Sequence, residues 1–175
     1  MLEDGSWINI RGEDGDEVTA TQEVVYGLTE NTEYTFRVRA KNVQGWSLTW
    51  SDEFTFITAT VPEQPAAITT SLENLKIRVA WAHPHDNWQP ILEYEVLIGN
   101  SDQSLWLANL KYCDGSKFDA TTVDLFCDVP VKEVLRQASY GYSFDQLVVA
   151  KVRARNIRGW STFSEPNLTG ERIQV

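Results

Sequence analysis

Two segments of this sequence place cations and tryptophans at a spacing that permits direct contact between them. Residues 38–51 read VRAKNVQGWSLTWS, and residues 152–161 read VRARNIRGWS. Cationic side chains on one face of a β-strand can stack on indole rings of the next strand, and each exposed cation–π contact is worth about 0.5–1 kcal/mol. The pattern therefore predicts two ladders of alternating cations and rings.

The residues expected in these ladders differ slightly between the copies. The first ladder is predicted to contain Arg37, Arg39, Trp46 and Trp50. The second is predicted to contain Arg153, Arg155 and Trp160, with Phe163 where another tryptophan would stand. The favoured interpretation is that each ladder braces its own sheet; the alternative is a docking face for a neighbouring domain or a ligand.

The elements that would position these side chains are β-strands. Residues 34–41 alternate apolar and polar side chains, which is the period of a half-buried strand, and residues 148–155 repeat the alternation in the same phase. Further strands are predicted at residues 7–10, 18–25, 54–58, 76–81, 92–98, 105–112, 125–129 and 171–175, and one helical turn at residues 131–137. Short strands at this spacing favour an all-β fold of antiparallel β-sandwiches.

A proline-containing segment, residues 61–67, is predicted to link two domains, because its two prolines cannot donate ladder hydrogen bonds and stiffen the chain. Residues 68–175 hold about seven strands, which is a complete sandwich. Residues 1–60 hold only four candidate strands. The first domain is therefore predicted to be partial.

The repeated segments resemble the fibronectin type III domain, in which a Leu-x-Pro-x-Thr-x-Tyr motif leads into a strand that continues into Asn-x-x-Gly-x-Ser. The first motif is matched by Leu28, Thr32 and Tyr34, with Glu30 in place of proline. The second motif is matched by Asn42, Gly45 and Ser47, and again by Asn156, Gly159 and Ser161. Trp81 and Tyr94 resemble the family's core tryptophan and tyrosine. Val148 aligns with Tyr34, so the hydrogen bond of that tyrosine must be absent or replaced in the second copy.

This resemblance implies two tandem immunoglobulin-like sandwiches, of which residues 1–60 correspond to the last four strands. A sandwich without its first three strands would expose apolar faces and open strand edges. We therefore expect the chain to be a segment of a longer array, or to receive strands from a neighbouring subunit by β-addition.

Two finer resemblances bear on location and binding. Residues 112–116, 127–130, 147–156 and 166–170 resemble repeats in large extracellular proteins of ciliated protozoa, which implies a secreted or surface location and tandem repetition. The cations and tryptophans resemble the ladder and the Trp-Ser-x-Trp-Ser box of cytokine receptors, although Trp46-Ser-Leu-Thr-Trp-Ser is one residue longer. That likeness implies a receptor ectodomain that binds a protein ligand at an interdomain elbow.

Two covalent modifications are suggested by single motifs. Cys113 and Cys127 are the only cysteines, and an even count near strand ends favours a disulfide over two buried thiols, hence an oxidising compartment. A disulfide across this loop would stabilise the fold by about 3 kcal/mol in the chain-entropy model. Asn167-Leu-Thr is the sole N-glycosylation sequon, on a predicted surface turn, and glycosylation of Asn167 is an open alternative there.

Catalytic and metal-binding patterns are weak. The trio His83, His85 and Asp86 is more simply a loop, and the acidic run Glu13–Glu17 is more simply a hairpin tip than a calcium loop. No nucleophile elbow, phosphate-cradling loop or zinc ligand set is present in the sequence. We therefore expect no enzymatic activity and no cofactor.

Charge and hydropathy limit the class of partner. The formal net charge of −10 opposes binding to nucleic acid, and no apolar run approaches the roughly 20 residues of a membrane-spanning helix. The sequence favours a non-enzymatic extracellular or cell-surface module, a tandem-repeat spacer or assembly unit of a larger surface or filamentous protein. Its expected partners are proteins, such as neighbouring domains or subunits of the same kind.

Overall fold

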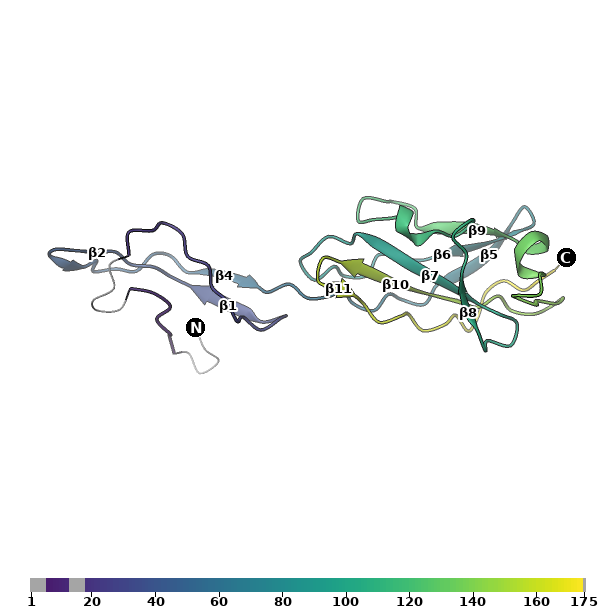
Figure 1. Cartoon of the computed structure of the whole chain (residues 1–175), viewed down its shortest axis with the longest axis horizontal. Helices are drawn as coiled ribbons and strands as arrows, with labels where there is room; N and C mark the ends of the chain where they lie inside the picture. The colour runs from purple at the N-terminus through teal and green to yellow at the C-terminus, as the bar shows by residue number, and fades with distance from the viewer. Residues whose placement is uncertain (1–5, 13–17, 175) are drawn as a thin grey trace. The chain divides into compact units, whose positions relative to one another are not determined.

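The computed structural model describes residues 6–12 and 18–174, which form two compact units, Met1–Ala59 (unit 1) and Thr60–Val175 (unit 2). Antiparallel strands dominate both units, with two short helical turns in unit 2 (Figure 1). The predicted all-β fold is therefore confirmed.

Unit 2 is built from two sheets. One sheet has the order β5 (Thr69–Glu73), β6 (Lys76–Ala80), β9 (Phe126–Pro130). The other has the order β11 (Gly159–Trp160), β10 (Ala150–Asn156), β7 (Glu93–Gly99), β8 (Trp106–Ala108). The 3₁₀ turn η1 (Gly115–Lys117) precedes β9, and the π-helical turn η2 (Val131–Leu135) follows it.

The core of unit 2 follows from strict alternation along its strands. Ile77 and Val79 of β6, Val129 of β9, Ile98 of β7 and Val152 of β10 are each at most 1% exposed. These side chains belong to a single apolar cluster that draws on both sheets, which makes unit 2 a β-sandwich.

The tyrosine hydrogen bond expected to change in unit 2 is replaced. In unit 1 the Tyr34 hydroxyl accepts a hydrogen bond from the backbone N–H of Thr29, at 2.9 Å. In unit 2 the position of Tyr34 is held by Val148, and the Tyr142 hydroxyl instead accepts from the backbone N–H of Val149, at 3.1 Å.

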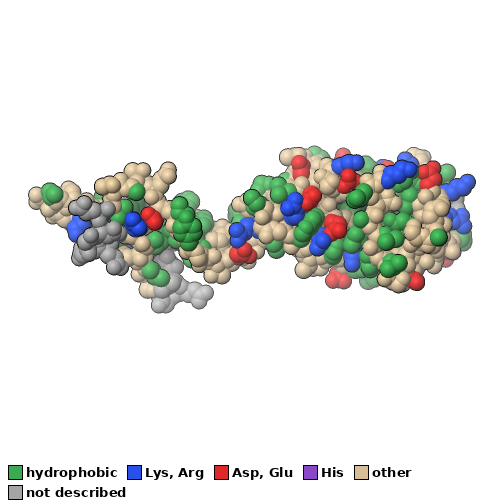
Figure 2. All heavy atoms as spheres, viewed as in Figure 1, with side chains coloured by type: hydrophobic (Ala, Val, Ile, Leu, Met, Phe, Trp, Pro, Cys, Tyr) green, Lys and Arg blue, Asp and Glu red, His purple; other side chains and the backbone are tan. Residues whose placement is uncertain are grey.

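Unit 1 contains two short antiparallel pairs. Strand β1 (Glu33–Phe36) pairs with β4 (Phe54–Ile57), and β2 (Lys41–Asn42) forms a hairpin with β3 (Gly45–Trp46). Phe36 and Phe56 stack at 5.6 Å between ring centroids. None of the described residues of unit 1 is buried, and Val38 and Phe54 are 69% and 66% exposed. Figure 2 shows hydrophobic side chains at the surface of this unit.

Several predicted strands are shorter than expected or not formed. Residues 7–10 and 18–25 are not strands. No described strand of unit 1 pairs with them, whereas in unit 2 β7 pairs with β8 and β6 pairs with β9. Only part of residues 105–112 forms β8, and residues 171–174 make a single bridge, between Leu147 and Arg172. Strand β5 was not predicted, since its Thr and Ser residues weaken the apolar alternation.

The segment predicted as a linker, residues 61–67, falls within unit 2. Asn156 Nδ2 donates to the carbonyl of Thr60 at 2.8 Å, and Asn87 Nδ2 donates to the carbonyl of Val61 at 2.8 Å. Pro62 and Pro65 are both buried. Side-chain amides thus satisfy carbonyls of this proline-rich stretch, which has few N–H donors of its own.

Candidate functional site

The cations and aromatic rings of unit 1 alternate along one line. The guanidinium of Arg37 lies 3.8 Å from the ring centroid of Trp7 and 4.6 Å from that of Trp50. Arg39 lies 4.5 Å from both Trp50 and Trp46. The ladder ends with Lys41, whose Nζ lies 5.3 Å from the Trp46 ring. The structure thus brings together Arg37, Arg39, Trp46 and Trp50 and adds Trp7, which sequence reasoning missed.

Unit 2 repeats this arrangement with equivalent residues. Lys151 lies 4.3 Å from the Trp106 ring and 4.7 Å from the Phe163 ring. Arg153 follows, 4.5 Å from Phe163 and 4.6 Å from Trp160, and Arg155 lies 5.7 Å from Trp160. Phe163 therefore occupies the place of Trp50. Trp106, like Trp7, comes from a segment distant in sequence from the repeat.

Serine side chains attach the tryptophan-bearing segment to the cationic strand. In unit 1 the Ser51 hydroxyl accepts from the N–H of Val38 at 3.0 Å, and the Ser51 N–H donates to the Val38 carbonyl at 2.8 Å. Ser164 makes the same two hydrogen bonds with Val152, at 3.1 and 2.7 Å. These bonds set the spacing at which each ring reaches the cation on the neighbouring strand.

The extra residue of the first tryptophan segment leaves the ladder unchanged. Trp46 and Trp50 are four positions apart, whereas Trp160 and Phe163 are three apart. Leu48 is fully exposed, and the Ser47 hydroxyl closes the segment by donating to the carbonyl of Thr49 at 2.9 Å. The additional residue is accommodated by an outward loop.

Carboxylates on β7 complete the second ladder. Strand β7 pairs with β10 so that Glu95 lies opposite Arg153 and Glu93 opposite Arg155. Arg153 Nε donates to Glu95 at 2.6 Å, and Arg155 Nε donates to Glu93. The alternation of Glu93-Tyr-Glu-Val could have predicted these partners. In unit 1, Arg37 lies 3.7 Å from Glu53.

A hollow of about 570 Å³ lies in unit 1 between these strands and residues 7–12 and 23–28. Its lining includes the indoles of the ladder and apolar side chains such as Phe36, Val38 and Phe54. Cationic and aromatic groups therefore meet an uncovered apolar surface in the same unit.

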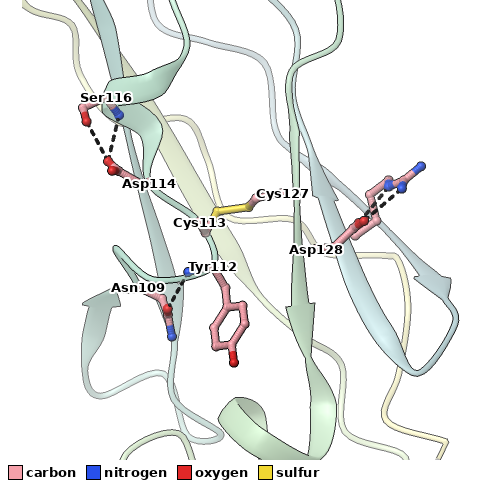
Figure 3. The surroundings of a disulfide bond; sticks show 8 residues. Asn109, Tyr112, Cys113, Asp114, Ser116, Cys127 and Asp128 are labelled. Atoms are coloured by element: carbon pink, nitrogen blue, oxygen red, sulfur yellow. Dashed lines mark hydrogen bonds and ion pairs between the residues drawn. A yellow bond between two sulfur atoms is a disulfide. The ribbon is translucent and has the colours of Figure 1, made fainter.

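The two cysteines form a disulfide in unit 2 (Figure 3). Cys113 and Cys127 are 2% and 6% exposed, and the bond ties the segment after β8 to β9. Asp114, next to Cys113, accepts hydrogen bonds from the N–H and hydroxyl of Ser116 and caps η1. The pair is therefore part of the packed core and is closed to solvent.

Strand β9 also carries an ion pair on its outer side. Arg78 of β6 donates to both oxygens of Asp128, at 2.9 and 3.0 Å. This side-chain hydrogen bond from Arg78 lowers the pKa of Asp128 below its usual value. Arg78 also stacks on Phe126, 3.9 Å from its ring centroid.

Asn167, the sequon residue, lies in the core. It is 3% exposed, and its Nδ2 donates to the carbonyls of Val148 and Thr169 at 2.9 and 3.1 Å. Its Oδ1 accepts from the N–H of Ala150 at 2.8 Å. Leu168 and Thr169 of the sequon are exposed, but the Asn167 side chain itself is buried, because it takes the place of a strand partner for residues 148–150.

The histidine trio makes ordinary loop contacts. His83 Nδ1 lies 2.6 Å from the Tyr94 hydroxyl and its Nε2 lies 2.8 Å from the carbonyl of Thr122. Burial raises the pKa of Tyr94, which keeps this hydroxyl neutral. Within residues 6–12 and 18–174, no group of three His, Cys, Asp or Glu side chains could hold a metal ion. The acidic run Glu13–Glu17 lies outside the described residues.

Comparison with known proteins finds a family match within unit 1. Residues 4–57 match the family model of the fibronectin type III domain. This match covers 54 of the 175 residues, all of them within unit 1. Domains of this family are generally non-enzymatic and commonly serve as structural or binding modules. The described residues include no helix with the length and hydropathy of a membrane-spanning segment.

Solved structures of multi-domain proteins are also similar. The FN1–FN3 domains of chicken CNTN1 are 15% identical with a TM-score of 0.43, over 64% of this chain and 32% of that chain. A titin segment, domains A168–A170, is 22% identical with a TM-score of 0.42, over 83% of this chain and 44% of that chain. The chain therefore spans less than half the length of either. No curated protein sequence matches it.

Proposed function

We propose that the chain is a non-enzymatic structural and protein-interaction module, a tandem-repeat spacer or assembly unit of a larger surface or filamentous protein. The observation that carries this proposal is the uncovered apolar surface of unit 1. Its described residues include none that is buried, although Phe36, Phe54 and Phe56 gather on adjacent strands. Uncovered apolar surface of this kind is typical of protein interaction sites.

We propose further that unit 2 is a second domain of the same kind. This proposal is supported by equivalent hydrogen bonds next to the two ladders. Ser47 N–H donates to the Ala40 carbonyl and Ser161 N–H to the Ala154 carbonyl, each at 2.8 Å. Asn42 Oδ1 accepts from the N–H of Gln44, and Asn156 Oδ1 accepts from the N–H of Arg158.

An extracellular or cell-surface location agrees with the disulfide, since such bonds persist in oxidising compartments. The likeness of unit 2 to the repeats of ciliate surface proteins points the same way. The expected partners are neighbouring domains or subunits of the same kind. The net charge of −10 disfavours nucleic acid as a partner.

The proposal is tested by size-exclusion chromatography with light scattering over a hundredfold range of concentration. Assembly through the apolar face of unit 1 predicts a molar mass that rises above that of one chain, together with quenched or blue-shifted tryptophan emission from unit 1. A chain that stays monomeric at every concentration, alone and mixed with its native neighbouring domains, would contradict the proposal.

A second candidate is a receptor ectodomain that binds a protein ligand. Trp160-Ser-Thr-Phe-Ser favours it, because this segment has the spacing of the cytokine-receptor box with phenylalanine in place of the second tryptophan. A monomer that captures one soluble ligand with fixed stoichiometry in the same light-scattering experiment would favour this candidate over the first.

A further inference from the structure

The cationic strand of unit 2 has a neighbour at each edge. On one side β10 pairs with β11, and Ser164 binds the backbone of Val152. On the other side β10 pairs with β7 over six residues, from Ala150 opposite Ile98 to Arg155 opposite Glu93. Carboxylates and apolar residues alternate along β7, so that Glu93 and Glu95 meet the ladder while Tyr94 and Val96 enter the core.

The equivalent strand of unit 1 is bonded at one edge. Val38 and Ala40 direct backbone groups towards Ser51 and Ser47, as Val152 and Ala154 do towards Ser164 and Ser161. Within the described residues, β1 pairs with β4 alone and β2 with β3 alone, and no strand takes the position of β7. In the part of the chain that the structure describes, the second backbone edge of residues 37–41 therefore has no strand beside it.

The side chains at this edge match the chemistry of β7. Arg39 is equivalent to Arg153; it stacks between two indoles, and the structure shows no carboxylate bound to it in the described parts of the chain. The Nε of Arg37 is buried and has no hydrogen-bond acceptor there. Val38 is 69% exposed, whereas its equivalent, Val152, is fully buried beside β7. In the described residues, Arg39 on one face has no carboxylate partner, and the apolar surface at Val38 on the other face is uncovered.

We propose that residues 37–41 bind an antiparallel β-strand in which acidic and apolar residues alternate, as in Glu93–Ile98. An acidic residue of that strand would pair with Arg39 on the ladder face, and the apolar residues would cover Val38 and Phe36 on the other. This inference deepens the proposed function, on which it rests, by giving the chemistry of the partner. Charge complementarity sets the register, because a shift by one residue would turn the carboxylates towards the apolar face.

The test uses the full chain and two labelled peptides. The first has the sequence of residues 91–99, ILEYEVLIG, and in the second both glutamates are replaced by lysine. Fluorescence anisotropy is expected to show about tenfold tighter binding of the acidic peptide at low salt, with the difference reduced at high salt. Hydrogen exchange is expected to show new protection at residues 37–41. Equal affinity for both peptides, or no protection there, would overturn the inference.

Charge reversal provides a second arm. The variant Arg39→Glu is expected to invert the preference, so that the lysine peptide binds more tightly than the acidic one. Lys132→Glu, at an exposed site of unit 2, is the matched control and should leave the preference unchanged. If Arg39→Glu disrupts unit 1, as judged by hydrogen exchange of β1 and β4, Arg39→Gln removes the charge, retains a hydrogen-bond donor and should abolish the preference. A preference that survives in both variants would refute the role of Arg39.

Failure of this inference differs from failure of the proposed function. Concentration-dependent assembly of the chain without any charge preference would overturn the acidic-strand partner and leave the assembly proposal standing. Selective binding of the acidic peptide by a chain that never assembles would support the acidic-strand partner and overturn the assembly proposal.

Discussion

Two polar side chains, Asn167 in the core and Asp128 on the outer side of β9, stabilise the sandwich in different ways. Asn167 lies in the core, where its amide satisfies the backbone of residues 148–150. Asp128 lies on the outer side of β9, where Arg78 holds both of its oxygens. Asn167 therefore stabilises the fold through buried hydrogen bonds, and Asp128 stabilises it through an ion pair.

Replacing Asn167 by alanine should destabilise unit 2 by about 2–3 kcal/mol, because it leaves a buried N–H and a buried carbonyl without partners. Denaturant unfolding measures the change. Thr169→Ala is the matched control, since it abolishes the sequon and keeps the amide; Thr169 is exposed. We expect this control to change neither the stability nor the mass of chain secreted from eukaryotic cells. A loss of glycan mass in Thr169→Ala would show that Asn167 is modified and contradict its burial.

The Asp128–Arg78 pair should make the stability of unit 2 depend on pH. Arg78 lowers the folded-state pKa of Asp128 below the unfolded value of about 3.9, so the ionised carboxylate stabilises the fold above that value. This contribution is lost as pH falls through the folded-state pKa. Asp128→Asn should therefore melt below the native chain at neutral pH, and the two melting temperatures should converge once the pH has fallen below the folded-state pKa of Asp128. A difference that persists unchanged in acid would exclude this ion pair as its cause.

At the level of the elements, each ladder joins three segments through their side chains. In unit 2 the segments are β8 with Trp106, β10 with its cations, and the stretch after β11 with Phe163. The central ring in each ladder, Trp50 or Phe163, lies between two cations, so removing it weakens contacts with two neighbours at once.

Phe163→Ala should therefore destabilise unit 2 by about 1–2 kcal/mol, the sum of two exposed cation–π contacts with Lys151 and Arg153. Thermal unfolding measures this change. The control is Phe144→Ala, because Phe144 is 70% exposed, and its loss should cost less than about 0.5 kcal/mol. Equal effects of the two substitutions would mean that Phe163 contributes only general surface hydrophobicity. Phe163→Trp should retain the stability.

The elements differ in how far the sequence predicts them. Alternation in residues 76–81 and 92–98 predicts β6 and β7 closely, because both faces of these strands have clear roles in a closed sandwich. It fails for residues 7–10 and 18–25, since an apolar pattern forms a strand only where a partner lies beside it. The ladder cations follow from alternation alone. Trp7 and Trp106 could not be found that way, because their contacts with Arg37 and Lys151 depend on the tertiary arrangement.

Across the whole molecule, the two units share one ladder design and differ in packing. Unit 2 encloses a core from two sheets, whereas the described part of unit 1 has strands and a braced outer face without a buried residue. The stability of unit 2 is therefore expected to be its own. That of unit 1 is expected to depend on the protein surface that covers it.

The most direct measurement of this difference is hydrogen exchange by mass spectrometry on the full chain at several concentrations. At the lowest concentration, where the chain is monomeric, amides of β1 and β4 should exchange within seconds, while those of β6, β7 and β10 stay protected for hours. Protection in residues 33–57 should rise with concentration, or on addition of native neighbouring domains, and that of unit 2 should not change. A monomer in which β1 and β4 exchange as slowly as β10 would contradict the claim that unit 1 needs a partner to complete its fold.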